Sequence, residues 1–134
     1  MKLIDNPLHL GMGATAKVEP LFTGEPSWYE SYAERHSDDG LEGRLVSMHS
    51  FSEPWDVWEM HPHGAEAVIC IAGSITLRQE MLDGSTKSVD LEAGEYAVNE
   101  AGVWHTADVE GKASVLFITA GLGTEHRPRN PDHR

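Results

Sequence analysis

Cysteine, positive charge and long apolar runs are all scarce in this sequence of 134 residues. The single cysteine, Cys70, excludes an internal disulfide and fits a reducing compartment such as the cytoplasm. Ten basic against 22 acidic residues give a formal net charge of −12, which argues against nucleic acid or an anionic membrane as a partner. No apolar run approaches the ~20 residues of a membrane span, and residues 1–7 lack the apolar core of a signal peptide. We therefore expect a soluble, cytoplasmic protein.

The composition, 40% hydrophobic and 24% charged, is that of a single globular domain. Residues 1–40 are expected to form an N-terminal arm and a short helix that pack on a β-barrel over residues 41–120, followed by a C-terminal tail over 121–134. A short strand is expected near Thr15 to Val18. Ser27, followed three residues later by Glu30, matches the capping-box pattern and predicts a helix from Trp28 to His36.

From Leu41 to Thr119 the pattern changes to short strands separated by turn signals. Ala67 to Ala72 is continuously apolar, which predicts a strand buried on both faces. Asp83-Gly84 between two alternating segments predicts a hairpin. Eight short strands are typical of an all-β double-sheet jelly-roll barrel. The expected strands cover residues 44–51, 55–61, 67–72, 74–81, 87–91, 96–99, 104–109 and 113–119.

A candidate metal site lies directly before the apolar strand. Glu59, His61, His63 and Glu66 place two carboxylates and two imidazoles within eight residues, and these groups are the usual protein ligands of divalent transition metals. Glu59 and His61 stand two apart on an alternating segment, so their side chains point to the same face. A bend at residues 62–65 can bring Glu66 beside His61. His105, which follows a turn on a later strand, is the best placed of the remaining histidines to complete the site.

This segment resembles the first motif of the cupin superfamily, in which His-x-His, three or four residues, Glu, six residues and Gly follow one another. Glu66 and Gly73 fit this pattern as they stand. If Glu59 and His61 take the places of the two histidines, the gap to Glu66 is four residues, which fits. If His61 and His63 take those places, the gap is one residue too short.

The second cupin motif consists of Gly, five residues, Pro-x-Gly, two residues and His. Gly94, Gly102 and His105 match it, with Glu100 in place of the proline and Val109 at the final position, where the family usually has asparagine. The resemblance implies a small single-domain cupin, with a double-stranded β-helix and a metal site inside the barrel. The preferred ligands are Glu59, His61, Glu66 and His105, with His63 as the alternative to Glu59.

Such a site suits Fe, Mn, Ni or Zn. The resemblance implies either a small-molecule metalloenzyme, of the dioxygenase or the Lewis-acid isomerase or lyase type, or a non-catalytic module that binds or senses a small ligand. A homodimer is also expected, with Trp58 and Met60 as a candidate partner surface. His49 and Cys70 are candidate cavity-wall residues, and Arg44 and Arg78 are candidate anchors for a substrate carboxylate.

Overall fold

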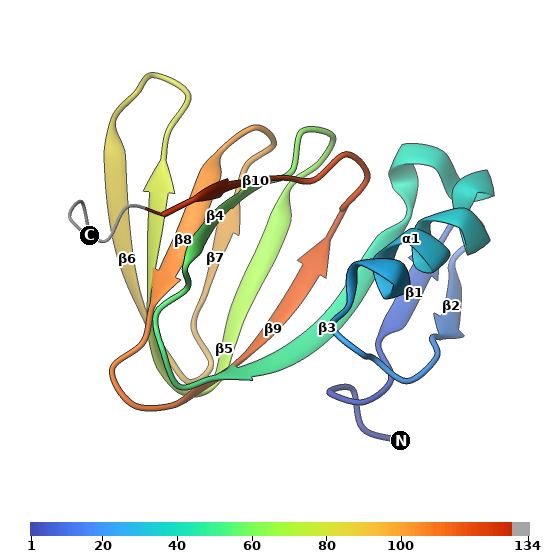
Figure 1. Ribbon diagram of the computed structural model, residues 1–134, viewed down its shortest axis with the longest axis horizontal. Helices are drawn as coiled ribbons and strands as arrows, with labels where there is room; N and C mark the ends of the chain where they lie inside the picture. Colours follow the sequence, from blue (N-terminus) through green and yellow to red (C-terminus); the bar gives the residue numbers. More distant parts are fainter. Residues whose placement is uncertain (130–134) are drawn as a thin grey trace.

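The computed structural model describes residues 1–129, and within them the chain folds into a strand-rich barrel with one α-helix and one 3₁₀ helix (Figure 1). The expected all-β jelly roll with a short N-terminal helix is confirmed. The helices are α1 (Pro26–Arg35) and η1 (Ser37–Glu42). The strands are β1 (Leu8–Gly11), β2 (Thr15–Val18), β3 (Arg44–Phe51), β4 (Val57–Met60), β5 (Glu66–Glu80), β6 (Thr86–Glu92), β7 (Tyr96–Asn99), β8 (Trp104–Asp108), β9 (Ala113–Thr119) and β10 (Glu125–Pro128).

All strand pairs are antiparallel and form two sheets that share β5. We call the first sheet A; its strand order is β2-β1-β3-β9-β5-β7. We call the second sheet B; its order is β10-β4-β8-β5-β6. In Figure 1, β4 and β10 cross in front of the strands of sheet A, so the two sheets enclose a common interior.

Strand β5 is one continuous strand of 15 residues, whereas the sequence predicted two strands divided at Gly73. Its first half pairs with β7 and β9 in sheet A, and its second half pairs with β6 and β8 in sheet B. The pairing register shifts between Cys70 and Ala72, and Gly73 has a φ of +74°. A bulge and a glycine let a strand bend sharply without ending it, so β5 turns here from one sheet into the other.

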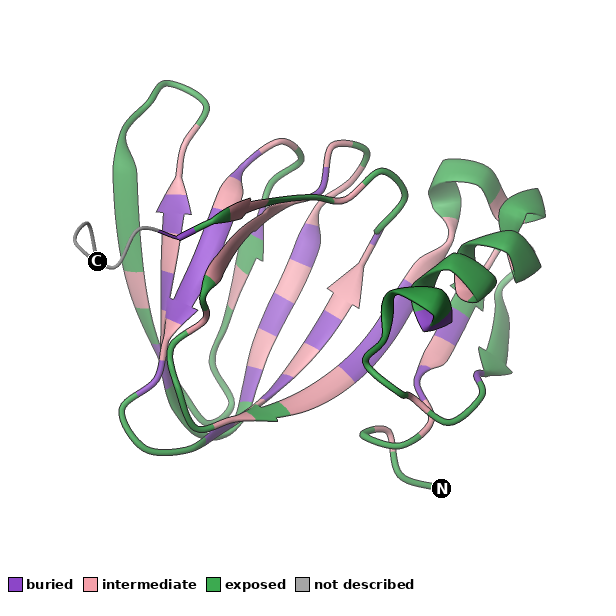
Figure 2. Ribbon diagram, viewed as in Figure 1, coloured by how far each residue is buried: buried purple, intermediate pink, exposed green. Residues whose placement is uncertain are grey.

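The prediction that residues 67–72 are buried on both faces is wrong. Glu66, Val68 and Cys70 are buried, whereas Ile71 is 44% exposed and the intervening residues are only half-buried. Figure 2 shows this alternation as bands along β5 and β9. The apolar run therefore reflects a sheet with one face on the core and a second apolar face outside. The core inside the barrel consists of Val68, Cys70, Ile75, Leu91, Ala107, Val109, Ala113, Val115 and Phe117.

Helix α1 begins at Pro26, and its N-cap lies two residues earlier in the sequence than predicted. The predicted capping box at Ser27 is wrong, because Ser27 lies inside the first turn and Glu25 is the N-cap, without a side-chain cap hydrogen bond. Proline suits the first helical turn, since its fixed φ is helical and its missing N–H would have no helical partner there. Trp28 is the buried residue of the helix, and its ring packs against those of Phe22 and Tyr32.

The strand near Thr15 to Val18 is confirmed as β2, whereas β1 and β10 were not predicted. Strand β10 pairs with β4 along its whole length, within the segment expected as a tail; residues 130–134 of that tail lie outside the described residues. Arg127 of β10 stands over the rings of Trp58 and Trp104, 5.2 and 4.6 Å from their centroids. Among residues 1–129, no helix is long and apolar enough to cross a membrane.

Candidate metal centre

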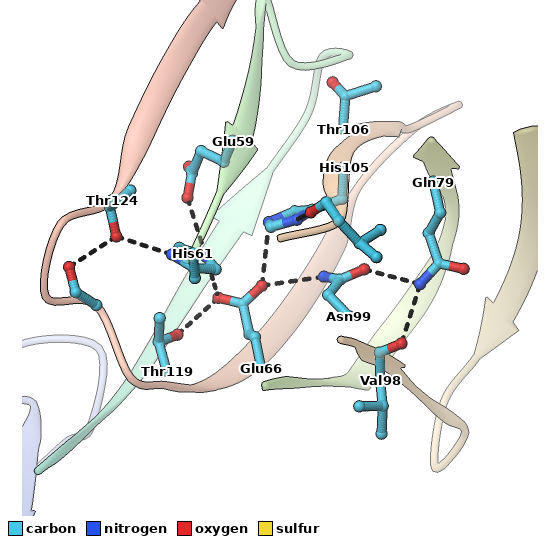
Figure 3. A network of polar contacts seen from close by, with 12 residues as sticks. Glu59, His61, Glu66, Gln79, Val98, Asn99, His105, Thr106, Thr119 and Thr124 are labelled. Carbon is cyan, nitrogen blue, oxygen red and sulfur yellow. Dashed lines mark hydrogen bonds and ion pairs between the residues drawn. The ribbon is translucent and has the colours of Figure 1, made fainter. Parts of the chain in front are cut away.

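Three side chains meet inside the barrel, two from the neighbouring strands β4 and β8 of sheet B and one from the residue that follows β4. Glu59 on β4 pairs directly with His105 on β8, and His61 follows two residues after Glu59 on the same face. Each of the three offers one possible ligand atom, and these atoms lie within 4.8 Å of one another. Both histidines are buried, and Figure 3 shows all three side chains directed toward Glu66.

A backbone hydrogen bond joins the turn before β8 to the end of β4. The amide of Gly102 donates to the carbonyl oxygen of His61, at 3.0 Å. Gly102 has a φ of +83°, a conformation that glycine adopts without strain. The turn before β8 is thereby fixed against the end of β4, which explains how two segments some forty residues apart in sequence reach one point.

Glu66 lies at the start of β5 with its buried carboxylate between the two imidazoles. Its Oε2 is 3.2 Å from His61 Nε2, and its Oε1 is 3.2 Å from His105 Nε2. Thr119 donates to Oε2 at 2.6 Å and Asn99 donates to Oε1 at 3.1 Å. Gln79 donates to the Asn99 carbonyl oxygen at 2.8 Å and so fixes the orientation of that amide (Figure 3). The carboxylate is held in place from the side away from the histidines.

The hydrogen-bond partners of the two imidazoles assign their tautomers. The hydroxyl of Thr124 donates its one proton to Gly121 O, so it accepts a hydrogen bond from Nδ1–H of His61, at 2.8 Å. Nδ1 of His105 faces the carbonyl oxygen of Val103 at 3.3 Å, which can only accept. In each neutral ring, Nε2 therefore carries a lone pair and no proton.

These two lone pairs face carboxylate oxygens, and lone pair and oxygen repel each other unless a cation lies between them. Both Nε2 atoms are buried without a partner of hydrogen-bond geometry among residues 1–129. A proton on an imidazole or a shared metal ion would supply the positive charge. Hydrogen bonds from Nδ1 to a neighbouring oxygen, which leave Nε2 free, are typical of metal-binding histidines. The donor set therefore fits a divalent transition metal.

Without a metal, the charge balance of the site rests on protons. Burial alone would raise the pKa of Glu66, but the adjacent imidazoles of His105 and His61 outweigh it and hold this pKa well below its usual range. Burial alone would lower the pKa of His105, but the Glu66 carboxylate outweighs it and raises this pKa. The metal-free site accordingly favours an ionised Glu66 beside a protonated His105.

We expect the metal-free protein to be most stable between about pH 4.3 and 6.5, the pKa values of unfolded Glu and His. Because folding lowers the pKa of Glu66, the ionised carboxylate contributes stability in full above about pH 4.3. This contribution is lost as the pH falls from there through the folded pKa. Because folding raises the pKa of His105, the protonated ring contributes stability in full below about pH 6.5. This contribution is lost as the pH rises through the folded pKa. Urea midpoints of chelator-treated protein from pH 3 to 9 test this. In Glu66→Gln the decline above pH 6.5 should become smaller, because the Glu66 contribution to it is lost while the contribution of Glu59 remains, and an unchanged decline would contradict the assignment.

Glu59 is the most accessible of these side chains, at 27% exposure. Its Oε1 lies 3.6 Å from His61 Nε2, and its Oε2 lies 3.8 Å from Nε2 of His126 on β10. The contact with Glu59 raises the pKa of His126. Burial and the Glu59 charge raise the pKa of Tyr29 on α1 to about 12. Glu59 thus marks the side of the centre that opens toward α1 and β10.

His63 does not join this group. It is exposed in the loop between β4 and β5, where a Cβ added to Gly123 would lie 3.4 Å from its Cδ2. His49 lies on the inner face of β3, with its ring 4.9 Å from that of Phe22, and burial lowers its pKa. Cys70 also faces inward, but it is part of the apolar core.

A second cluster of His and Asp side chains joins the N-terminal arm to the helices. His9 contacts Tyr32 OH through Nδ1 at 2.6 Å and Asp39 through Nε2 at 2.5 Å, and Glu19 contacts His36 at 2.9 Å. His9, His36 and Asp39 have ligand-type atoms within 4.8 Å of one another. The two imidazole rings, however, are stacked 3.6 Å apart at an interplanar angle of 13°. Lone pairs in parallel ring planes do not converge on one ion, so this cluster serves packing and not metal binding.

The two arginines considered as substrate anchors are bound elsewhere. Arg78 pairs with Asp108 on the outer side of sheet B and lines a cleft that shares no residue with the metal centre. Arg44 donates to the carbonyl oxygen of Ala65 at 3.4 Å. Neither guanidinium contacts Glu59, His61, Glu66 or His105.

The sequence interpretation missed the residues that support the ligands. Asn99 lies on the inward face of β7, as Ala97 does, and Thr119 lies on the inward face of β9, as Phe117 does. A polar side chain at a position where the alternation demands an apolar one must find a buried partner. That departure from the pattern is the signal that could have identified them.

No family model and no curated protein matches this sequence, but solved structures do. Oxalate oxidase in complex with the substrate analogue glycolate matches with a TM-score of 0.57 at 20% identity, over 69% of this chain and 50% of that chain. Hydroquinone 1,2-dioxygenase from Sphingomonas sp. TTNP3, with 4-hydroxybenzoate bound, matches with a TM-score of 0.50 at 16% identity, over 57% of this chain and 59% of that chain. A cupin superfamily protein from Desulfitobacterium hafniense matches with a TM-score of 0.48 at 20% identity, over 57% of this chain and 65% of that chain.

This chain thus covers less than two thirds of the length of each of these three proteins. At such low identity the similarity is one of fold, and it carries no ligand or substrate with it.

Proposed function

We propose that this chain, a protein of cupin fold, is a metalloprotein that acts on a small molecule at one divalent metal ion inside its barrel. The proposed ligands are Glu59, His61, Glu66 and His105. The observation that carries the proposal is the pair of buried Nε2 atoms of His61 and His105, both turned toward carboxylate oxygens and without a hydrogen-bond partner among residues 1–129.

The charge of the donor set supports a divalent ion. Two carboxylates and two neutral imidazoles sum to −2, which a divalent cation neutralises. Burying a charge in a protein interior is costly unless it is compensated, so a neutral assembly is favoured over a bare anionic one. Mixed imidazole and carboxylate ligands suit Fe, Mn, Ni and Zn, and affinity alone does not choose among them.

When bound, the ion would supply either oxygen activation, if it is Fe(II), or Lewis-acid polarisation of a substrate, if it is redox-silent. The chain's own residues would hold and orient it. Thr119 and Asn99 fix the Glu66 carboxylate, and Thr124 fixes the His61 ring. A small molecule would approach past Glu59, the most exposed of the four ligands, between Tyr29 and His126.

The solved structures of similar fold agree with small-molecule chemistry. The matched oxalate oxidase holds glycolate, and the matched hydroquinone dioxygenase holds 4-hydroxybenzoate. Both names describe oxidations of small molecules. Because the shared property is the fold, the proposal stops at small-molecule chemistry and leaves both types, oxidase or dioxygenase and isomerase or lyase, as candidates.

Elemental analysis of protein purified without added metal or chelator tests the proposal. We expect close to one equivalent of a transition metal per chain. After chelation, titration calorimetry with Fe(II), Mn(II), Ni(II) and Zn(II) should show one site, and Glu59→Gln should weaken it more than about tenfold. Protein that is purified without metal and binds none of the four ions would contradict the proposal.

A further inference from the structure

Strand β10 contacts the candidate metal centre at two points. Thr124, directly before the strand, accepts the hydrogen bond from Nδ1 of His61, at 2.8 Å. His126 lies opposite Glu59 in the pairing of β10 with β4, and its Nε2 is 3.8 Å from Glu59 Oε2. Because Glu59 is the most exposed of the proposed ligands, β10 borders the side on which the centre is open.

Little apolar burial holds β10 in place. It is an edge strand of sheet B, with β4 as its single neighbour among residues 1–129. Glu125, His126 and Pro128 are exposed, and Arg127 is half-buried. Segments with few buried apolar contacts open locally at a lower free energy than the core strands. The attachment of β10 therefore depends on its backbone pairing and on its arginines.

The guanidinium of Arg127 fastens the middle of β10 to sheet B. It lies 5.2 Å from the centroid of the Trp58 ring on β4 and 4.6 Å from that of the Trp104 ring on β8. It also forms an ion pair with Glu80 on β5. Arg127 thus covers Trp58, the residue considered above as a partner surface, and ties β10 to three other strands without contacting any of the proposed ligands.

Arg129 fastens the end of β10 that lies farther from the metal centre. Its side chain is 2% exposed and pairs with Asp108 at 2.8 Å. Its Nη1 donates to the carbonyl oxygens of Trp55 and Ala107, at 3.2 and 3.3 Å. Because this end is buried, we expect it to stay attached when the rest of the strand moves.

The end of β10 nearer the metal centre has the composition of a hinge. Gly121 and Gly123 lie between β9 and β10, and Gly123 has a φ of +78°. Hinges are short loop segments that absorb changes of φ and ψ, and glycine has the widest range of both angles. The start of β10 can therefore swing about residues 121–123 while β4 and β9 stay in place.

Some part of the chain must move before an ion can reach the centre. The Nε2 atoms of His61 and His105 are buried. Of the two elements that border the open side, α1 is packed through the buried Trp28, whereas β10 buries no apolar side chain. Strand β10 is therefore the element that moves at the lower cost.

We propose that β10 is a strap that opens about residues 121–123 to admit and release the metal ion, and that Arg127 is the positioning residue that keeps it closed. The inference rests on the proposed metal site. In the closed state Thr124 orients the His61 ring and His126 lies over Glu59. Opening breaks both contacts and gives an ion access from this side.

Stopped-flow measurement of Zn(II) uptake and release tests the proposal. Release into excess chromophoric chelator and uptake by chelator-treated protein should both be about tenfold faster in Arg127→Ala, which loses two cation–π contacts and one exposed ion pair. Since the strap opens more often to the same degree with and without the ion, the dissociation constant should change less than about threefold. Faster release with unchanged uptake and a raised dissociation constant would show damage to the ligands instead, and would overturn the proposal.

Arg78→Ala is the matched control. Arg78 and Arg127 are 38% and 39% exposed, and each pairs with a carboxylate on sheet B. Arg78 lies on β5, however, and its loss leaves Asp108 to Arg129. Both rates should stay within about twofold of the wild type. Arg127→Lys keeps a cation near the two rings and should give rates between those of the wild type and Arg127→Ala. Circular dichroism verifies that each variant folds.

Hydrogen exchange of the chelator-treated wild type tests the opening without any metal. The amides of β10 should exchange at least about tenfold faster than those of β8, the other neighbour of β4. Exchange as slow as that of β8, or Zn(II) rates that do not respond to Arg127→Ala, would overturn the strap and leave the metal site in place. A protein that takes up no Zn(II) or other transition metal at equilibrium would overturn both proposals, and this is seen before any rate is measured.

Discussion

Replacing His105 with alanine is expected to lower the affinity for Zn(II) more than about 100-fold, because loss of a supporting residue alone costs 10- to 100-fold and this change removes a ligand. His105 is fully buried, with its Nε2 facing Glu66. Competition with a chromophoric chelator measures the change. His61→Ala should have the same effect, because its ring stands in the same relation to Glu66.

His63→Ala provides the control for this comparison. His63 lies only two residues from His61 in the sequence, yet it is exposed and stands outside the group formed by Glu59, His61 and His105. Its removal should leave the Zn(II) affinity within about threefold of the wild type, a change smaller than the loss of a supporting residue causes. Loss of metal in His63→Ala with retention in Glu59→Gln would instead favour the alternative ligand set, with His63 in place of Glu59.

Gly73→Ala is expected to destabilise the fold by more than about 4 kcal/mol, the range reached by severe single substitutions. A Cβ at this position would lie 2.1 Å from the carbonyl oxygen of Lys112 and 3.1 Å from Cα of Ala113. Both are backbone atoms where β9 begins, so relief requires that this end of β9 and the turn before it move away from β5. The positive φ of +74° adds about 1–2 kcal/mol of strain for a residue with a side chain. The free energy of unfolding in urea measures the sum.

Gly84→Ala separates the two causes. Gly84 has a φ of +87°, but nothing lies within 4 Å of its Cβ position. Gly84→Ala should therefore lower the free energy of unfolding only by the backbone strain, about 1–2 kcal/mol. Equal losses in Gly73→Ala and Gly84→Ala would show that the close approach of Lys112 to β5 is not what makes Gly73 necessary.

Much of the fold follows from local pattern, and the exceptions have physical causes. Alternation and turn residues predict most strands, because each strand has one face on the core. The division of β5 at Gly73 was wrong because a glycine between two apolar segments looks the same whether the chain turns back or bends through a bulge. Strand β10 was missed because its residues, Glu125 to Pro128, are polar and pair with β4 chiefly through backbone and through Arg127.

The candidate ligands were predictable because they lie in or beside the two sequence motifs. Glu59, His61, Glu66 and His105 were expected to approach one another, and the structure brings them together; their role as ligands stays a prediction. The supporting residues Asn99, Thr119 and Gln79 could not be assigned in the same way. Each is separated in sequence from the ligand it serves, and only the closing of the barrel brings it there.

The course of β5 ties the site to the shape of the whole barrel. The strand starts at Glu66 in sheet A and reaches Gln79 in sheet B after the bend at Gly73, and yet these two residues are joined through the single amide of Asn99. Strand β5 is therefore a bent strand whose two end regions are linked to each other across the interior by hydrogen bonds. A substitution that straightens β5 at its bend, even one far from the candidate metal centre, would move Glu66 away from the histidines. None of the four proposed ligands would itself have been changed.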